Sequence, residues 1–175
     1  MKNLVLVGFM GSGKTSAGKL VAHRLSMEFL DMDAVIEQRT GQTVADIFQT
    51  KGEAAFRSYE RELVVELAGR EGLVIATGGG IILNSENVRD FSRTGIVVCC
   101  WVDPAAAFER TKHTKHRPLL ESDSDRRVRL ESLLQEREPL YRTIPLQLDT
   151  SHLTVEQQAD ALVRIYQEQS ARTRL

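Results

Sequence analysis

A glycine-rich segment near the start of the chain restricts the possible folds more than any other feature. It covers residues 8–15, GFMGSGKT, and matches the pattern G-x-x-x-x-G-K-[ST]. The apolar run 4–7 precedes it, and apolar residues at helical spacing follow it. A chance match in a chain of 175 residues is on the order of one in a hundred. The pattern therefore predicts a strand, a tight loop and a helix, in that order.

The chemistry of this segment is that of a phosphate-binding loop. Glycines let backbone amide groups approach phosphate oxygens, and the following helix directs the positive end of its dipole at them. We expect the Lys14 ammonium to reach the β- and γ-phosphates of a nucleotide and the Thr15 hydroxyl to bind Mg²⁺. A flexible turn with an exposed lysine is the alternative. The predicted nucleotide-binding residues of this segment are Gly11, Ser12, Gly13, Lys14, Thr15 and Ser16.

Short apolar runs recur along the chain and predict buried strands. They cover residues 4–7, 27–30, 73–76, 96–102 and 146–148. Segments with apolar residues at helical spacing lie between them. Because strands that alternate with helices form parallel sheets covered on both faces, the sequence predicts an α/β fold. The length of 175 residues is typical of one domain, which we expect to span residues 1–175.

Composition and charge exclude several classes of protein. Hydrophobic residues make up 42% of the chain, so an intrinsically disordered protein is not expected. The 23 Lys and Arg residues against 24 Asp and Glu residues give a net charge of -1, which does not indicate a nucleic-acid-binding protein. The longest apolar run, residues 96–102, is too short to cross a bilayer, and no signal peptide is evident. We therefore expect a cytoplasmic protein that binds neither nucleic acid nor membranes.

The phosphate-binding pattern alone does not identify a reaction. GTPases, motor ATPases and small-molecule kinases all use such a loop. A single domain of this length favours a small-molecule kinase, so the other polar residues must indicate the phosphoryl acceptor.

Two aspartates, Asp31 and Asp33, follow the second apolar run. Residues two apart in an extended segment point to the same side, and ligands of open α/β sheets bind at the carboxyl ends of the strands. We expect one carboxylate to lie near Mg²⁺ and the other to accept a proton from a substrate hydroxyl. A solvated pair that caps the following helix is the alternative.

Two arginines occupy positions where helical spacing predicts a partly buried face. Arg57 lies at the edge of an apolar stripe that includes Glu60, three residues further on, and Arg137 continues the apolar stripe of a later segment. Because buried charges need partners, we expect Glu60 to orient Arg57, and Arg137 to meet a carboxylate or phosphate. The alternatives are an ordinary surface ion pair and, for Arg137, a side chain that only extends toward solvent.

Two further segments have features of a ligand site. Gly78, Gly79 and Gly80 follow the third apolar run and allow a ligand to approach the backbone closely, although a plain turn is the alternative. The polar segment 112–125 is predicted to form a mobile lid, from which Arg117 could reach the transferred phosphoryl group. A solvated run of charges is the alternative there.

In this order, the motifs resemble those of the shikimate kinase family along nearly the whole chain. They are residues 8–15, 31–33, 56–60, 78–80, 117–120 and 137–141. The resemblance implies ATP-dependent phosphorylation of the 3-hydroxyl group of shikimate, on the route to chorismate and the aromatic amino acids. It also implies a P-loop NTPase fold, a three-layer α/β/α sandwich whose five-stranded parallel sheet has the order 2-3-1-4-5. A helical substrate-binding region at about residues 33–62 and a lid at about residues 112–125 complete the implied architecture.

The resemblance also implies roles for the acceptor residues. Asp33 would bind the acceptor hydroxyl and act as the general base, and Arg57 and Arg137 would hold the shikimate carboxylate. Gly79 and Gly80 would contact the substrate through the backbone.

On the nucleotide side, Asp31 and Thr15 would hold Mg²⁺ as the cofactor, with ATP as co-substrate. Arg117 would contact the ATP phosphates and act in catalysis with Lys14, and Arg110 would lie near the adenine. We expect a monomer.

Two other interpretations remain open. A different small-metabolite kinase, such as a gluconate kinase, would also direct arginines at a carboxylate, although the ordered set of motifs favours the shikimate kinases. The other is a regulatory module that binds nucleotide without catalysis, and the presence of Lys14, Thr15, Asp33 and Arg117 argues against it.

Overall fold

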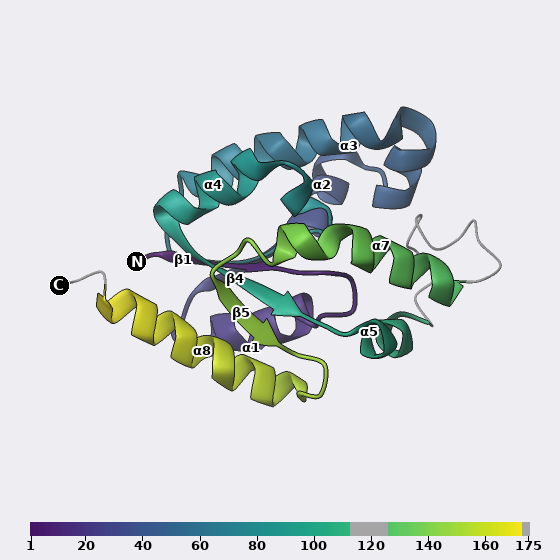
Figure 1. The fold of residues 1–175 in the computed structure, drawn as a ribbon. Coiled ribbons are helices and arrows are strands. Elements are labelled where there is room, and N and C mark those ends of the chain that lie inside the picture. Colours follow the sequence, from purple (N-terminus) through teal and green to yellow (C-terminus); the bar gives the residue numbers. More distant parts are fainter. Residues whose placement is uncertain (113–125, 173–175) are drawn as a thin grey trace.

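A five-stranded parallel sheet forms the centre of the molecule (Figure 1). The computed structural model describes residues 1–112 and 126–172, and within them the strand order is β2-β3-β1-β4-β5. The predicted strands are confirmed to within one residue at either end, and the implied strand order is correct. The strands are β1 (Asn3–Val7), β2 (Glu28–Asp31), β3 (Leu73–Ala76), β4 (Gly95–Trp101) and β5 (Leu146–Asp149).

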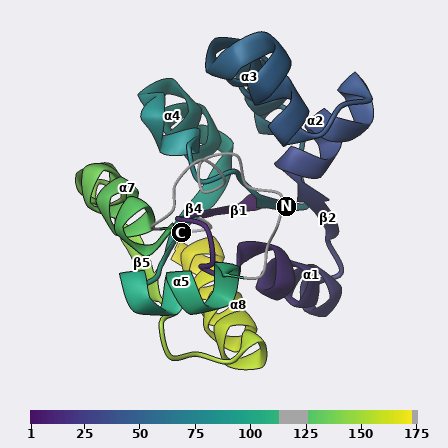
Figure 2. The same ribbon diagram turned by 90° about the vertical axis from the view of Figure 1, so that its right-hand side faces the viewer.

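Helices cover both faces of this sheet, as the view turned by 90° in Figure 2 shows. Successive side chains of a strand point to opposite faces, so Leu4 and Leu6 face one side of β1 and Val5 and Val7 the other. The first side packs against α1 (Lys14–Leu25) and α8 (Val155–Arg172). The second side packs against α2 (Met32–Thr40), α3 (Val44–Ala68), α4 (Ser85–Thr94), α5 (Pro104–Thr111) and α7 (Arg126–Tyr141). None of the helices described in the structure is long and apolar enough to cross a membrane.

The ends of β1, β2 and β3 lie together at one edge of the sheet. Leu6 of β1 and Asp31 of β2 both pair with Ala76 of β3. The phosphate-binding loop after β1, the segment with Asp31 and Asp33 at the end of β2 and the glycines after β3 therefore leave the sheet side by side. The parallel pairing supplies the shared edge that the sequence analysis assumed.

A glycine divides α3 into two parts. Gly52 has φ 83° and ψ 169°, a backbone conformation that is essentially restricted to glycine, and it lies inside the span Val44–Ala68. The second part of α3 carries Arg57 and Glu60. Residues 33–62, the predicted substrate-binding region, fall on α2 and most of α3.

The buried side chain of Asn3 joins β1 to the connection between α3 and β3. Its Nδ2 donates to the carbonyl oxygens of Leu67 (3.3 Å) and Arg70 (2.8 Å), and its Oδ1 accepts from the amide of Leu73 (2.9 Å). This side chain satisfies three backbone groups at the end of β1 opposite the phosphate-binding loop.

Replacing Asn3 by leucine should lower stability without affecting ligand binding. The change keeps the approximate volume but leaves three backbone groups without their partner, so the free energy of unfolding should fall by about 2–3 kcal/mol. Urea denaturation measures this change, and affinity for ligands at the opposite end of β1 should match the wild type. An unchanged unfolding midpoint would show that the three hydrogen bonds contribute nothing net.

Candidate active site

The loop between β1 and α1 has the conformation that its glycines allow. Gly13 has φ 80°, and a Cβ placed on it would lie 2.5 Å from Oε1 of Gln158. At Gly8 a Cβ would lie 2.3 Å from the carbonyl oxygen of Cys100. Neither position has room for a side chain. Backbone conformation and the packing of β4 and α8 thus both require glycine in the loop.

Lys14 lies inside the curve of this loop. Its Nζ donates to the carbonyl oxygens of Gly8 (2.8 Å) and Phe9 (2.9 Å) and to Oγ of Ser12 (3.3 Å). Only 9% of the residue is exposed. The ammonium group is therefore held where the loop turns, which contradicts the alternative of an exposed lysine on a flexible turn.

Two buried residues from the C-terminal part of the chain hold the loop from outside. Oγ1 of Thr150 (3.2 Å) and Nε2 of Gln158 (2.9 Å) both donate to the carbonyl oxygen of Ser12. The sequence analysis did not identify either residue. A polar side chain on the apolar face of the C-terminal helix was the available signal for Gln158.

Arg110 connects the phosphate-binding loop to the segment after β5. Its Nη1 donates to the carbonyl oxygen of Gly11 (3.1 Å), and its Nη2 donates to those of Thr150 (2.7 Å) and Ser151 (3.1 Å). The guanidinium group therefore lies beside the loop, and the role predicted for Arg110 near the adenine stays a prediction.

A cavity of about 610 Å³ lies between the loop, the end of α5 and the start of α8. This volume is typical of small-molecule sites. Except for Ser12, which is fully buried behind the surface, the nucleotide-binding residues predicted in the loop line it together with Arg110. The sequence analysis assigned no residue to the part of the wall that follows β5, which comprises Leu153, Thr154, Val155, Glu156 and Gln158.

Thr15 and Asp31 form a pair of oxygen donors beside the loop. The Thr15 hydroxyl donates to Oδ2 of Asp31 at 2.7 Å. Mg²⁺ prefers oxygen ligands and is usually held by one or two protein groups together with phosphate and water. These two residues therefore fit a Mg²⁺ site next to the phosphate-binding loop.

The local geometry predicted for Asp33 was wrong. Asp31 is the last residue of β2, but Asp33 lies in the first turn of α2, not in an extended segment. Oδ1 of Asp31 accepts hydrogen bonds from the amides of Asp33 (3.1 Å) and Ala34 (3.4 Å). Capping of the new helix thus turns the chain immediately after the strand. The capping alternative is correct for Asp31, which also binds Thr15.

The glycines after β3 make room for side chains of the site. A Cβ on Gly78 would lie 2.9 Å from Oδ1 of Asp33, and a Cβ on Gly80 would lie 2.2 Å from Nη2 of Arg57. The sequence analysis predicted a close approach to the backbone of this segment. At these two glycines, charged side chains of the protein itself lie close to the backbone. Gly79 lies between them, and a Cβ there would be 3.7 Å from the carbonyl oxygen of Gly8.

Glutamates orient Arg57, as the spacing on the helix predicted for Glu60. Nη1 of Arg57 donates to Oε2 of Glu60 at 2.9 Å. Nε (3.2 Å) and Nη2 (3.0 Å) donate to Oε1 of Glu53, a partner that the sequence analysis did not identify. The exposed fraction of the side chain is 23% for Arg57 and 1% for Glu60.

Helix α7 adds a third wall to this site. The Tyr141 hydroxyl donates to the carbonyl oxygen of Gly79 at 2.6 Å. Arg137, one turn earlier, is 6% exposed, and its Nε has no hydrogen-bond partner among residues 1–112 and 126–172. Oε1 of Glu60 is likewise buried and has no partner in the described part of the chain. The site thus contains one donor and one acceptor that a ligand could satisfy.

The family model for shikimate kinase matches residues 10–167 of this chain. The chain belongs to the shikimate kinase family. The shikimate kinase of Pelotomaculum thermopropionicum is 45% identical over 96% of this chain and 97% of that protein. The enzyme of Methylococcus capsulatus is 40% identical over 99% of this chain and 97% of that protein.

Solved structures show the same relationship. A shikimate kinase from Acinetobacter baumannii in complex with shikimate has a TM-score of 0.89 at 37% identity, covering 98% of this chain and 94% of that one. A gluconokinase from Sinorhizobium meliloti has a TM-score of 0.57 at 17% identity over 98% of this chain and 97% of that one, which shows a shared fold alone.

The structure thus brings together most of the residues predicted for this shikimate kinase site. Asp33, Arg57 and Arg137 lie around the segment 78–80, which lies against the phosphate-binding loop. Arg117 and residues 113–125 of the predicted lid lie outside the described residues, so both stay predictions. The roles of the individual residues also stay predictions.

Charge and burial act in opposite directions on Glu60. Burial raises the pKa of Glu60 from an ordinary value of 4.5 to about 7, and the nearby Asp33 carboxylate adds to this effect. Arg57 and Arg137 oppose the shift because they favour the ionised form. The folded protein therefore binds a proton at this position over a pH range in which the unfolded chain has lost it.

Stability should consequently fall as the pH rises from about 4.5 to 7. We expect the free energy of unfolding of the wild type to fall by on the order of 2 kcal/mol relative to Glu60→Gln over this range, because glutamine stays neutral. Urea denaturation of both proteins at several pH values measures the difference. Parallel pH profiles would show that Glu60 titrates normally in the folded state.

Proposed function

We propose that this protein transfers the γ-phosphoryl group of ATP to the 3-hydroxyl group of shikimate, giving shikimate 3-phosphate and ADP. Membership of the shikimate kinase family supports this reaction, which lies on the route to chorismate and the aromatic amino acids. The geometric observation that carries the proposal is the convergence of Arg57, Arg137 and Asp33 beside the phosphate-binding loop. Two cations and a carboxylate suit an acceptor that has both a carboxylate and hydroxyl groups.

Some of the acceptor residues would bind the substrate, and one would accept its proton. Arg57, held by Glu53 and Glu60, and Arg137 would bind the shikimate carboxylate, which would give Nε of Arg137 a partner. The backbone of Gly79 and Gly80 would contact the substrate. Asp33, next to Gly78, would accept the proton of the 3-hydroxyl group as its oxygen attacks the γ-phosphorus.

The nucleotide residues would hold the donor in line with that hydroxyl. Backbone amides of the loop and the Lys14 ammonium would bind the triphosphate, and Arg110 would lie near the base. Thr15 and Asp31 would hold Mg²⁺, which supplies neutralisation of phosphate charge when bound. Arg117 would reach the phosphates from the lid, and the lid would exclude water from the reaction. We expect the enzyme to work as a cytoplasmic monomer made of a single domain.

A comparison of acceptors tests the proposed function. ADP release should require shikimate together with Mg-ATP, and gluconate at the same concentration should give no more release than a reaction without acceptor. A coupled ADP assay with shikimate, gluconate and no acceptor measures this. Equal release in all three would indicate an ATPase, release with gluconate alone would indicate the other kinase, and ATP binding without release would indicate a regulatory module.

Replacing Asp33 by asparagine should chiefly lower kcat. The amide cannot accept the hydroxyl proton, so we expect kcat to fall about a hundredfold or more, with the KM for ATP nearly unchanged. Steady-state kinetics with shikimate and Mg-ATP measure this. Asp160→Asn is the matched control, because Asp160 is an exposed partner of Arg24 on the opposite face. Near-normal kcat in Asp33→Asn would show that Asp33 is not the base.

A further inference from the structure

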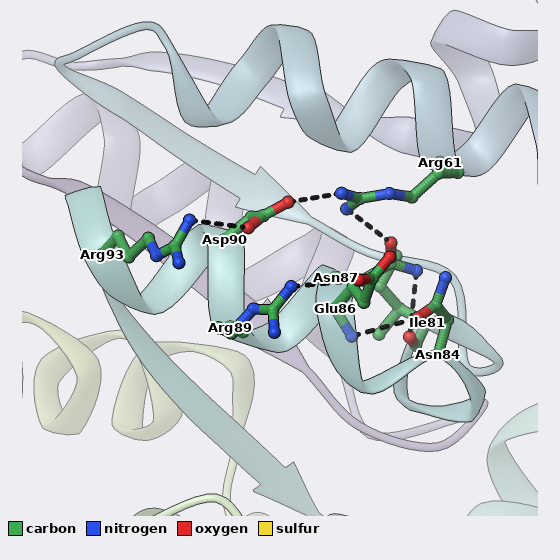
Figure 3. Close-up of polar contacts among 8 residues, drawn as sticks. All are labelled: Arg61, Ile81, Asn84, Glu86, Asn87, Arg89, Asp90 and Arg93. Carbon is green, nitrogen blue, oxygen red and sulfur yellow. Dashed lines mark hydrogen bonds and ion pairs between the residues drawn. The ribbon is translucent and has the colours of Figure 1, made fainter.

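A polar network connects α3 to α4 behind the acceptor site (Figure 3). Arg61, the residue after Glu60, donates from Nη1 to Oδ1 of Asn87 (3.2 Å) and from Nη2 to Oδ2 of Asp90 (2.5 Å). Asn87 and Asp90 lie on α4. None of these three residues lines the site described above, so the network has no assigned role in the reaction.

Asn87 extends the network to the glycine segment. It is 2% exposed, and its Nδ2 donates to the carbonyl oxygen of Ile81 at 3.3 Å. Ile81 directly follows Gly80 and is the first residue of the short helix η1 (Ile81–Leu83). Both ends of the Asn87 amide are therefore used, one by α3 and one by the backbone next to the acceptor site.

The spacing on α3 links this network to Arg57. Arg57 and Arg61 are four residues apart, so they lie one above the other on the same face of the helix. Arg57 lies against Gly80, and Arg61 reaches Ile81 through Asn87. The segment 78–81 is thus connected to α3 at two points. Gly80 lies against the Arg57 guanidinium, and Ile81 is linked to Arg61 through the buried amide of Asn87.

We propose that Arg61 and Asn87 are positioning residues that set the glycine segment against Arg57 and thereby determine the affinity for the phosphoryl acceptor. The proposal rests on the proposed function, because it concerns the carboxylate-binding side of the same site. Neither residue contacts the substrate. Both act through the placement of Gly79 and Gly80 relative to the Arg57 guanidinium.

Burial distinguishes this network from ordinary surface ion pairs on the same helix. The side chains of Arg61 and Asp90 are 28% and 17% exposed. By contrast, the pair Arg89 with Glu86 is 59% and 53% exposed and lies within α4 alone. A pair of that kind contributes little and connects no elements. Arg89 therefore offers a matched control, an arginine whose loss leaves the α3 to α4 contact intact.

Kinetics of three variants and one control test the proposal. Arg61→Met removes the donors to α4 but keeps an unbranched side chain, and Asn87→Leu removes both amide contacts. Asn87→Asp keeps an acceptor for Arg61 but removes the donor to Ile81. In all three, KM for shikimate should rise roughly three- to tenfold. KM for ATP should stay within about twofold of the wild-type value, and Arg89→Met should change neither.

The opposite results would overturn it. If Arg61→Met and Asn87→Asp fold and leave KM for shikimate unchanged, or raise both KM values equally, the network is only structural. If Asn87→Leu fails to fold, the other two variants still decide whether the proposal holds.

Failure of the proposed function can be distinguished from failure of this inference. If the wild type does not phosphorylate shikimate, the proposed function is wrong, and amide hydrogen exchange of residues 78–83 in the same proteins decides the positioning role. Faster exchange in Asn87→Asp than in the wild type and Arg89→Met would support it, and equal exchange would overturn it.

Discussion

The parallel hydrogen bonding of the sheet is the constraint on which the rest of the site depends. Because neighbouring strands run in the same direction, their connections leave from one edge. β1 lies between β3 and β4, so the phosphate-binding loop is flanked by the glycine segment after β3. A Cβ on Gly79 would be 3.7 Å from both the carbonyl oxygen of Gly8 and the amide of Met10. Backbone pairing of the strands thus brings the donor and acceptor sites together.

Without a ligand, the charged groups of the acceptor site are not fully compensated by the described residues around them. Arg57, Arg137 and Asp33 lie close enough to Glu60 to influence its pKa, and the raised pKa of Glu60 reflects the cost of burying its charge. The unpartnered Nε of Arg137 adds a donor that no described residue satisfies. An anion that accepts from both guanidinium groups would satisfy this donor. The same arrangement that lowers stability is therefore suited to binding a carboxylate.

The sequence predicted the elements of this protein better than the contacts between them. Strand positions and the phosphate-binding loop follow from local patterns, apolar runs and a glycine spacing, and both were correct. Asp33 was placed in an extended segment because the sequence pattern did not show that Asp31 caps a helix that begins directly after it. Gln158 and Asn87 were missed because each has a partner in a distant part of the chain. These partners, Ser12 and Arg61, become evident only when the helices are packed.

The two halves of the site are held by different parts of the molecule. Thr150, Gln158 and Arg110, from the segments after β4 and β5, hold the phosphate-binding loop on the nucleotide side. On the acceptor side, the connection between α3 and α4 through Arg61 and Asn87 supports the glycine segment. Because the two sets share no residue, a change in one can alter the affinity for its substrate while the other stays intact. The two halves meet where the glycine segment contacts the loop, at the place where the phosphoryl group would pass.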